Sequence, residues 1–520
     1  MASLLILTQP IQKIITQLPK VLKAASNHVT TKRLYIHLDY LTMNQTLKQF
    51  RSYGYRSYII STIYSVSPSF CPGIDIRILM NGFKEKDLPI ETNQNVEKIY
   101  IDYLSSPSDF MLLEKKYEGI LNVNNSLILL DKVDAEEKVL DIVIEEGEDK
   151  VYDDVVAGGT FDRIHPGHKI LLSEAVLRSR KRLTIGVADG PLLKRKVLKE
   201  LILPCPERIL SLREFLSDID RCLEYNLVTI EEPMGPTSYD PKMEMIVVSE
   251  ETKEGVQMIN DYRKDKGLNE LENYCIKVFD DSQKQFIEEE DKFSSSSQRM
   301  RLLGTRIRKV TPNLSIPDVP YVIGLTGGSA SGKTNIGRVL KEMGAAVIDC
   351  DKLGHKAYEY GTKCYENLVK VFGGEIVNED NTINRKVLGS MVFNSKDKLK
   401  QLTDIVWPQI ALLAKKEMKV QFESGKKVMV LDAAVLLEAQ WDQFCHEVWV
   451  ATIDQEEAIR RIVERDQSTE EAASKRIQSQ MTNEERVASA NVVFCSRWSY
   501  EYTRKQVQSA WNLLQKEAKL

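Results

Sequence analysis

The sequence predicts an α/β protein of several domains, in which two domains with parallel sheets follow an additional N-terminal α/β region. Apolar strand-like runs alternate with helical sequence along the chain, which is typical of a parallel sheet with crossover helices. Two of the strand-to-helix junctions carry glycine-rich strings of different chemistry, GGTFDRIHPGH and GGSASGKT. The length of 520 residues leaves room for three or four domains of ordinary size.

The charge balance argues against a nucleic-acid-binding protein. The chain has 71 Lys and Arg against 75 Asp and Glu, so its net charge of -4 provides no global field that would attract a polyanion. No apolar run approaches the roughly eighteen residues that a membrane-spanning helix needs. We therefore expect no nucleic acid among the partners and no spanning helix.

The first 35 residues combine positive charge with a helical spacing of apolar side chains. Lys13, Lys20 and Lys23 precede the first acidic residue of the chain, and apolar residues recur between positions 11 and 22. This pattern is typical of a mitochondrial presequence or of an amphipathic helix that contacts a membrane surface. We expect residues 1–35 to form such a segment, with the protein in the mitochondrion, in its matrix or on its outer membrane surface, and in the cytoplasm. An ordinary first helix is the alternative.

Residues 36–150 are predicted to form an N-terminal α/β region. Strand-like runs occur at 32–38, 97–104 and 138–146, and polar stretches separate them. This region shows no catalytic pattern, so its role remains open.

Two further domains are predicted after it, at residues 151–310 and 321–520. The first of them contains buried strand patterns at 182–189 and 244–252, each followed by helical sequence. Between the two domains lies the segment 311–320, whose three prolines cannot continue a helix or a central strand. We interpret this segment as a linker.

The string from Gly158 to His168 lies between a strand and a helix and contains two of the six histidines of the chain. His165 and His168 are three residues apart at the start of the helix, so both imidazoles can donate to one anion that the helix dipole also attracts. We expect them to stabilise charge on a phosphate without a metal. A zinc half-site and a satisfied core pair are the alternatives.

The same T-x-x-x-x-H-x-G-H pattern resembles the nucleotidylyltransferase superfamily, which has a Rossmann-like fold. Together with GVADGPLLKRK and SSSSQRMR it resembles the eukaryotic and archaeal type of phosphopantetheine adenylyltransferase. The resemblance implies that the threonine and first histidine of the pattern contact ATP phosphates, that His168 stabilises the α-phosphate, and that Lys194 and Arg299 bridge substrate phosphates. For Lys194 a surface lysine is the alternative, and for the serines a flexible linker. The residues assigned to this site are Gly158, Thr160, Phe161, His165, His168, Lys194, Ser295, Ser296 and Arg299.

The second glycine-rich string satisfies the P-loop pattern GxxxxGK[ST], with a strand before it and an amphipathic helix after it. Its glycines let backbone N–H groups turn toward the β-phosphate of a nucleotide. Lys333 supplies a cation to the β- and γ-phosphates, and the Thr334 hydroxyl can hold Mg²⁺. We therefore expect ATP at Gly327, Gly328, Ser329, Ala330, Ser331, Gly332, Lys333 and Thr334.

Three carboxylates lie at the ends of predicted strands in the same domain. Asp349 and Asp351 follow the second strand, where either could accept a proton from an attacking hydroxyl. Asp432 ends the strand VMVL and is a candidate ligand for Mg²⁺-bound water. Helix capping or turn formation is the alternative for all three.

Arginines on later helices are candidates for neutralising phosphate charge. Arg461 and Arg465 are four residues apart on one helical face, and Arg476 with Gln480 repeats that spacing. Cations are needed to offset the charge of a phosphoryl group in transfer, so we expect a lid over the nucleotide. A solvated charged face is the alternative.

The strings TGGSASGKT, VIDCD, INRKVLG, LLEA, VERD and RIQSQ, in this order, resemble the dephospho-CoA kinase family of small P-loop kinases. The resemblance implies that Asp351 is the general base. It further implies that Arg385, Arg465 and Arg476 surround the phosphates and the CoA moiety. The chain departs from the family at Trp407, which stands where the family commonly has a histidine before proline.

An adenylyltransferase followed by a dephospho-CoA kinase resembles the bifunctional coenzyme A synthases of animals. The resemblance implies ATP, 4′-phosphopantetheine and dephospho-CoA as partners, and Mg²⁺ as cofactor. The first site would form dephospho-CoA and diphosphate, and the second would phosphorylate dephospho-CoA to CoA. The alternatives are another nucleotidylyltransferase fused to a nucleoside-type kinase, and a nucleotide-sensing scaffold without turnover.

Overall fold

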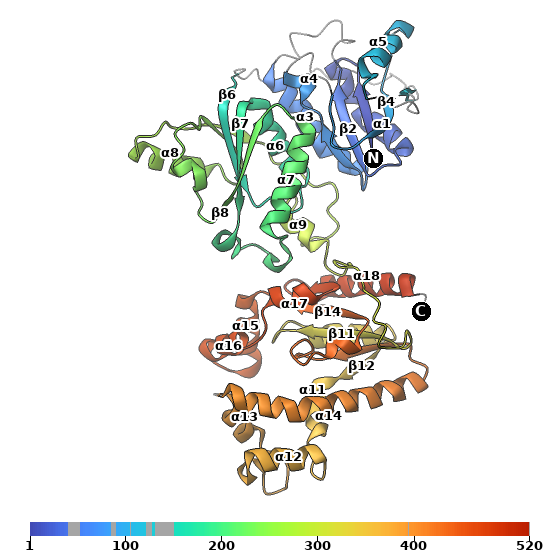
Figure 1. The fold of residues 1–520 in the computed structure, drawn as a ribbon, viewed down its shortest axis with the longest axis vertical. Helices are drawn as coiled ribbons and strands as arrows, with labels where there is room; N and C mark the ends of the chain where they lie inside the picture. The colour runs from blue at the N-terminus through green and yellow to red at the C-terminus, as the bar shows by residue number, and fades with distance from the viewer. Residues whose placement is uncertain are drawn as a thin grey trace. The chain divides into compact units, whose positions relative to one another are not determined.

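The fold is known from a computed structural model that describes residues 1–39, 52–84, 90–104, 106–120, 127–130, 150–393 and 395–518. The chain divides into two compact units, residues 1–298 and 299–520 (Figure 1). The described residues form three five-stranded sheets, in which every strand pair with a recorded register is parallel. The predicted α/β class with parallel sheets is therefore confirmed.

The first sheet has the strand order β3-β2-β1-β4-β5. Predicted strands at 32–38 and 97–104 correspond to β2 and β4, whereas the one predicted at 138–146 lies outside the described residues. The elements are β1 (Ala2–Leu7), α1 (Ile11–His28), β2 (Arg33–Leu38), α3 (Tyr53–Phe70), β3 (Asp75–Ile78), α4 (Asn81–Lys84), β4 (Val96–Ile101), α5 (Pro107–Tyr117) and β5 (Leu127–Leu129).

The amino terminus is part of this sheet, which corrects the boundary that we placed after residue 35. Strand β1 is central, pairs with β2 and β4, and is buried at all six positions. Helix α1 follows it, and its apolar face, with Ile14, Leu18 and Leu22, is buried in the hydrophobic core. The apolar spacing of residues 11–22 therefore reflects packing within the domain, as in the ordinary-helix alternative.

The second sheet has the order β10-β9-β6-β7-β8. Its core is continuous with that of the first sheet, since one cluster of buried apolar residues includes side chains from α1, α3 and α6. The elements are β6 (Tyr152–Gly159), α6 (Pro166–Arg178), β7 (Ser179–Ala188), η1 (Gly190–Leu193), η2 (Lys199–Leu201), α7 (Cys205–Ile219), β8 (Glu224–Ile230), η3 (Gly235–Ser238), β9 (Met245–Ser249), α8 (Glu254–Asp265), β10 (Glu272–Ile276) and α9 (Ser295–Met300).

The third sheet, in the second unit, has the order β12-β13-β11-β14-β15. Its central strand β11 leads into the P-loop string and then into α10. The elements are β11 (Tyr321–Gly327), α10 (Lys333–Glu342), β12 (Ala346–Asp349), α11 (Cys350–Ala357), α12 (Lys363–Phe372), η4 (Gly374–Ile376), α13 (Arg385–Phe393), α14 (Lys396–Glu423), β13 (Val428–Asp432), η5 (Trp441–Phe444), β14 (Glu447–Thr452), α15 (Gln455–Asp466), α16 (Glu470–Gln478), α17 (Asn483–Ser489), β15 (Val492–Cys495) and α18 (Tyr500–Ala518).

The boundary between the units differs from the predicted linker at 311–320. The division lies after Gln298, and the residues just beyond it bond to the third sheet. Gly304 donates its N–H to Val493 at 2.9 Å, in a left-handed conformation where a Cβ would lie 2.1 Å from a carbonyl oxygen of α18. Arg306 pairs with the buried carboxylate of Glu447 at 3.0 Å. Residues 299–310 therefore belong to the second unit.

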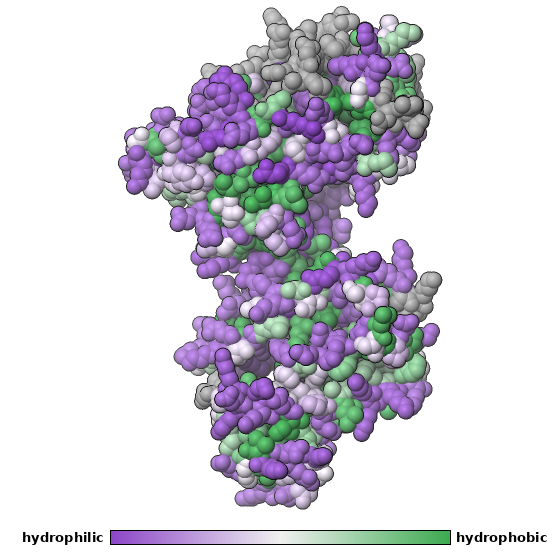
Figure 2. Space-filling model, in the orientation of Figure 1, coloured by the Kyte–Doolittle hydropathy of each residue, from purple (hydrophilic) through white to green (hydrophobic). Residues whose placement is uncertain are grey.

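The surface is largely polar on the face that Figure 2 shows, with apolar side chains in separate groups. Within the described ranges, every helix is too short or too polar to cross a membrane.

We predict that deletion of residues 1–28 unfolds the N-terminal part of the first unit, because it removes the central strand β1 and the buried face of α1. Thermal unfolding, monitored by circular dichroism, should show that the transition of this part is lost or that its midpoint falls by well over 10 °C. The midpoint of a domain of this size shifts by about 2–4 °C for each kcal/mol of lost stability. The Lys13→Ala, Lys23→Ala double variant, which alters only exposed charges, should unfold like the wild type. A truncated chain with an unchanged transition would contradict the assignment of β1.

We also predict that a fragment of residues 299–520 is more stable than one of residues 315–520. The shorter fragment loses Arg306, and breaking a buried ion pair costs about 3–5 kcal/mol. Urea unfolding of the two fragments measures the difference. Equal midpoints would show that residues 299–314 contribute no packing.

Candidate active sites

The first candidate site lies where β6 ends at the carboxyl edge of the second sheet. The chain leaves β6 through Thr160 and Phe161, whose backbone has a φ of 50°, and enters α6 at Pro166. Gly167 leaves room for the imidazole of His165, because a Cβ at Gly167 would lie 3.2 Å from that ring. This junction presents the N-terminus of α6, where an anion is favoured.

The two histidines of the string stack against each other at this helix start. Their ring centroids are 3.8 Å apart at an interplanar angle of 27°, and the ring of Phe161 lies 5.1 Å from that of His168. His165 is buried. The predicted pairing of two imidazoles at one helix N-terminus is thus present, and it suits a phosphate group.

The serine run lies beside this pair, at the start of α9. The Ser295 hydroxyl is 3.5 Å from Nε2 of His165 and donates to the carbonyl of Asp162 at 3.2 Å. Ser296 instead contacts Glu290, so the structure brings Ser295, but not Ser296, to the histidines. Lys194 is exposed after η1, beyond the carboxyl end of the neighbouring strand β7. Arg299 is buried and belongs to the second compact unit.

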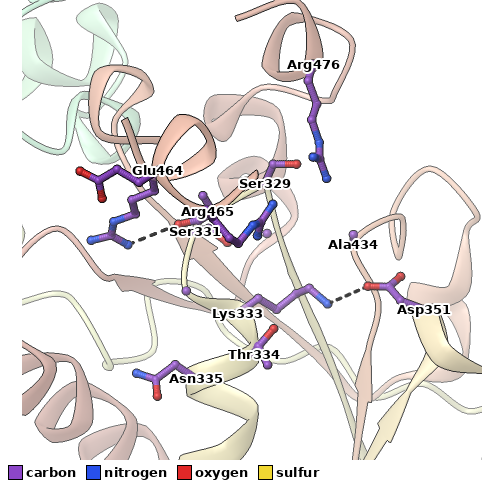
Figure 3. Close-up of a pocket in the computed structure, with 15 residues that line it drawn as sticks. Ser329, Ser331, Lys333, Thr334, Asn335, Asp351, Ala434, Glu464, Arg465 and Arg476 are labelled. Atoms are coloured by element: carbon purple, nitrogen blue, oxygen red, sulfur yellow. Dashed lines mark hydrogen bonds and ion pairs between the residues drawn. The ribbon is translucent and has the colours of Figure 1, made fainter. Parts of the chain in front are cut away.

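The second candidate site is a cavity of about 710 Å³ over the P-loop, which Figure 3 shows. Gly327 is tightly packed, since a Cβ there would lie 2.5 Å from Ser331 and 2.6 Å from a carbonyl of β14. Ala330 and Gly332 have φ values of 61° and 83°, which turn the loop before α10 begins. The lining residues are Gly327, Gly328, Ser329, Ala330, Ser331, Gly332, Lys333, Thr334, Asn335, Asp351, Ala434, Arg461, Glu464, Arg465 and Arg476.

Lys333, which lines this cavity, contacts two carboxylates. Its Nζ lies 3.4 Å from Asp351 and also contacts Asp432 (Figure 3 draws the Asp351 pair). Burial alone would lower the pKa of Lys333, but Asp432 and Asp351 outweigh it and raise that pKa above its usual value. Burial raises the pKa of Asp432, although Lys333 opposes the shift. A bound polyphosphate would compete with both carboxylates for the lysine.

Asp349, the other candidate base, caps a helix. Its carboxylate accepts from the backbone N–H of Lys352 at 2.9 Å, as N-cap of α11. Burial alone would raise its pKa, but the bonds from Lys352 outweigh that effect and lower the pKa. The capping alternative therefore holds for Asp349, and of these two candidate bases it is Asp351 that lines the cavity.

Three of the four predicted arginines line the cavity. Arg461 is held over the P-loop by bonds to Ser496, at 2.7 and 2.8 Å. Arg465 and Arg476 both bond to Asp466, so α15 and α16 present their guanidinium groups together. Arg385 is not among the lining residues and lies 2.7 Å from Nε2 of His355, at the start of α13.

Two family models match the parts of the chain that hold these sites. Residues 156–303 match the cytidylyltransferase-like family, and residues 321–497 match the dephospho-CoA kinase family. The dephospho-CoA kinase of Carboxydothermus hydrogenoformans is 37% identical over 36% of this chain and 90% of its own length. The chain belongs to the dephospho-CoA kinase family. A second dephospho-CoA kinase, from Geobacter sulfurreducens, is 37% identical over 36% of the chain and 96% of its own length. The solved protein TT1252 of Thermus thermophilus is 26% identical over 37% of the chain and 97% of its own length, with a TM-score of 0.34.

The dephospho-CoA kinase domain also contains a contact that we did not predict. Gln480 donates to the Ser329 hydroxyl at 2.8 Å and accepts from the Ser329 N–H at 2.9 Å. This pair of bonds joins the end of α16 to the P-loop. The spacing of Gln480 from Arg476 was visible in the sequence, but nothing in it indicates that the amide turns toward the loop.

Arg208 is a second residue that sequence reasoning missed. This arginine of α7 is 1% exposed and donates to the carbonyls of Thr160, Ala188 and Leu203 and to Asp189. It ties the chain after β6 to the end of β7, the two strand ends that carry the histidines and Lys194. A single arginine in an ordinary helix carries no sequence signal for such a role.

We predict that Arg208→Met lowers the thermal transition of the first unit and leaves that of the second unit unchanged. Each buried carbonyl left without a partner costs about 1–3 kcal/mol. Differential scanning calorimetry of the full chain would measure both transitions. Arg213→Met, at an exposed position of the same helix, is the matched control and should behave as the wild type. An unchanged first transition in Arg208→Met would contradict the bridging role.

Proposed function

We propose that this chain catalyses the last two steps of coenzyme A synthesis at two separate sites. The first would join ATP to 4′-phosphopantetheine, giving dephospho-CoA and diphosphate, and the second would phosphorylate dephospho-CoA. The observation that carries the proposal is the presence of both sites in one chain. The stacked histidines lie in the region that matches the cytidylyltransferase-like family, and the P-loop cavity lies in the region that matches the dephospho-CoA kinase family. The alternative of an unrelated fused transferase and kinase is not favoured, because the relatives are dephospho-CoA kinases.

At the first site, a phosphate oxygen of 4′-phosphopantetheine attacks the α-phosphorus of ATP and diphosphate leaves. His165 and His168 donate to the phosphates from the start of α6, and the Ser295 hydroxyl lies within reach of the same anion. Lys194 approaches from the end of β7. These donors stabilise the charge that develops at the α-phosphate, which is the main task in such a transfer.

At the second site, the ribose 3′-hydroxyl of dephospho-CoA attacks the γ-phosphorus of ATP. Asp351 accepts the hydroxyl proton, and its exposed position in the cavity allows contact with the substrate. Lys333 moves its charge to the β- and γ-phosphates, while Arg461, Arg465 and Arg476 balance the charge of the group in transfer.

The cavity also suits Mg²⁺, which comes with ATP. The Thr334 hydroxyl and the Asp432 carboxylate are hard oxygen ligands, and Mg²⁺ usually needs only one or two of them beside substrate phosphates. When bound, the ion would neutralise charge on the β- and γ-phosphates.

A location in the mitochondrion and the cytoplasm, with contact between the N-terminus and a membrane, stays a prediction. The apolar face of α1 packs inside the domain, so such contact would use exposed polar side chains of this helix, among them Lys13, Lys20 and Lys23. Fractionation of cells that express the chain would test the location.

Two substitutions should give opposite product patterns, because each site performs one step. His168→Ala should slow formation of dephospho-CoA on the order of a hundred- to a thousandfold, the usual effect of losing one such donor. Added dephospho-CoA should still be converted to CoA. Lys333→Ala should release diphosphate normally and accumulate dephospho-CoA, because the first site stays intact.

Chromatography with mass detection measures both products, and circular dichroism verifies that each variant is folded. Loss of dephospho-CoA phosphorylation in His168→Ala, or loss of diphosphate release in Lys333→Ala, would overturn the assignment of one reaction to each site. A wild-type chain that forms neither product would overturn the proposed function itself.

A further inference from the structure

The residue that follows His168 is buried and points away from the phosphate site toward the N-terminal part of the unit. Lys169 is only 9% exposed, and its Nζ donates to the Asp75 carboxylate at 2.5 Å and to the carbonyl of Ile76 at 2.9 Å. Both acceptors belong to β3 of the first sheet. The helix of the second sheet that carries the histidines is thus anchored to the first sheet by an ion pair.

The anchored turn is the one that holds the imidazoles. The N–H of Lys169 donates to the carbonyl of His165 at 3.0 Å, which is an opening bond of α6. His165, His168 and Lys169 therefore share one helical turn. The ion pair of Lys169 is therefore attached to the same turn as the stacked rings of both histidines.

The charges of this pair depend on each other. Burial alone would raise the pKa of Asp75, but Lys169 and Arg77 outweigh it and lower the pKa to about 2. Burial lowers the pKa of Lys169, and Asp75 opposes that shift. A buried lysine without a carboxylate partner is unfavourable. Loss of Asp75 would therefore push Lys169 out of its position.

The ion pair is part of a network that reaches a second helix of the transfer site. Arg33 and Arg77 bond to Asp75 at 3.2 and 3.0 Å, and both also bond to Asp218, at 3.1 and 2.7 Å. Asp218 is a buried residue of α7, the helix that carries the bridging Arg208. A network of ion pairs between acidic and basic side chains therefore connects the first sheet to both α6 and α7.

We propose that the N-terminal domain, whose role the sequence left open, sets the position of the adenylyl-transfer histidines through the Asp75–Lys169 ion pair. Lys169 and Asp75 are positioning residues, since neither faces the phosphate site. The inference rests on the proposed adenylyl transfer at this site. It assigns to the first sheet a direct influence on the first reaction and none on the kinase reaction.

The test is a double-mutant cycle in the full chain with Asp75→Asn, Lys169→Met and both together. A displacement of about 1 Å in catalytic geometry costs up to about a hundredfold in rate. Each single variant should lower the kcat of dephospho-CoA formation about ten- to a hundredfold, with the KM for ATP within about twofold. The double variant should be no slower than the slower single variant, because the two residues act as one unit. Phosphorylation of added dephospho-CoA should be unchanged.

The control is Asp102→Asn, which alters a buried carboxylate directly after β4 that bonds to Thr8 and Gln9 and not to α6. It should keep a wild-type kcat for dephospho-CoA formation. A similar loss of kcat in this control would overturn the proposal. The proposal would also be overturned if the losses of kcat in the single variants multiplied in the double variant, or if a folded single variant kept a wild-type kcat. If Asp75→Asn does not fold, Lys169→Met decides, because Asp75 then retains both arginines.

Hydrogen exchange separates failure of this inference from failure of the proposed function. The amides of the first turn of α6 should exchange faster in Asp75→Asn and in Lys169→Met than in Asp102→Asn, without any substrate. Faster exchange in a chain that forms no dephospho-CoA would uphold the anchor and reject the reaction. Unchanged exchange would reject the anchor.

Discussion

Both candidate sites depend on one constraint, the need to satisfy the first N–H groups of a helix that a short loop connects to a buried parallel strand. Those groups have no partner inside the helix, and together with the helix dipole they attract an anion. At the first site this helix is α6, which follows β6 of the second sheet. At the second site it is α10, which follows β11 of the third sheet. The side chains added at each start decide the chemistry, two stacked imidazoles in one case and Lys333 in the other.

The sequence predicted these junctions well because their chemistry is local. A glycine-rich string between a strand and a helix specifies its own turn, as the positive φ of Gly332 and the close packing of Gly327 illustrate. Asp351, Arg465 and Arg476 line the cavity. Their place there could be predicted because the resemblance to dephospho-CoA kinases supplemented the spacing of these residues in the sequence. The alternation of strands and helices was sufficient for the α/β class.

Features that depend on packing between distant segments were not predictable in this way. The spacing of apolar residues in α1 reveals that one face is apolar, but not that β1 and a protein core cover it. The prolines of 311–320 mark irregular backbone and do not indicate that residues 299–310 already pack on the third sheet. Arg208 has no neighbours in sequence that reveal its three carbonyl partners.

The N-terminal domain illustrates how a region whose sequence shows no catalytic pattern can still influence the chemistry of a neighbouring site. Its first sheet shares a hydrophobic cluster with the second, and buried charges are retained where these two sheets meet. Such charges are costly unless paired, so they define one arrangement of the helices more strictly than apolar contacts would. The segment that leads into α6 is bonded on one side by Arg208 of α7, which donates to the carbonyl of Thr160, and α6 itself is bonded through Lys169 to Asp75 of the first sheet.

The central claim is that each site uses a different phosphorus atom of ATP. The most direct measurement follows labelled phosphorus from ATP into the final product, with 4′-phosphopantetheine as the only other substrate. The account predicts that CoA carries one label from α-labelled ATP, in its diphosphate bridge, and one label from γ-labelled ATP, on the ribose 3′-position. A CoA product that lacks the α-label, or in which the γ-label lies in the bridge, would contradict the account.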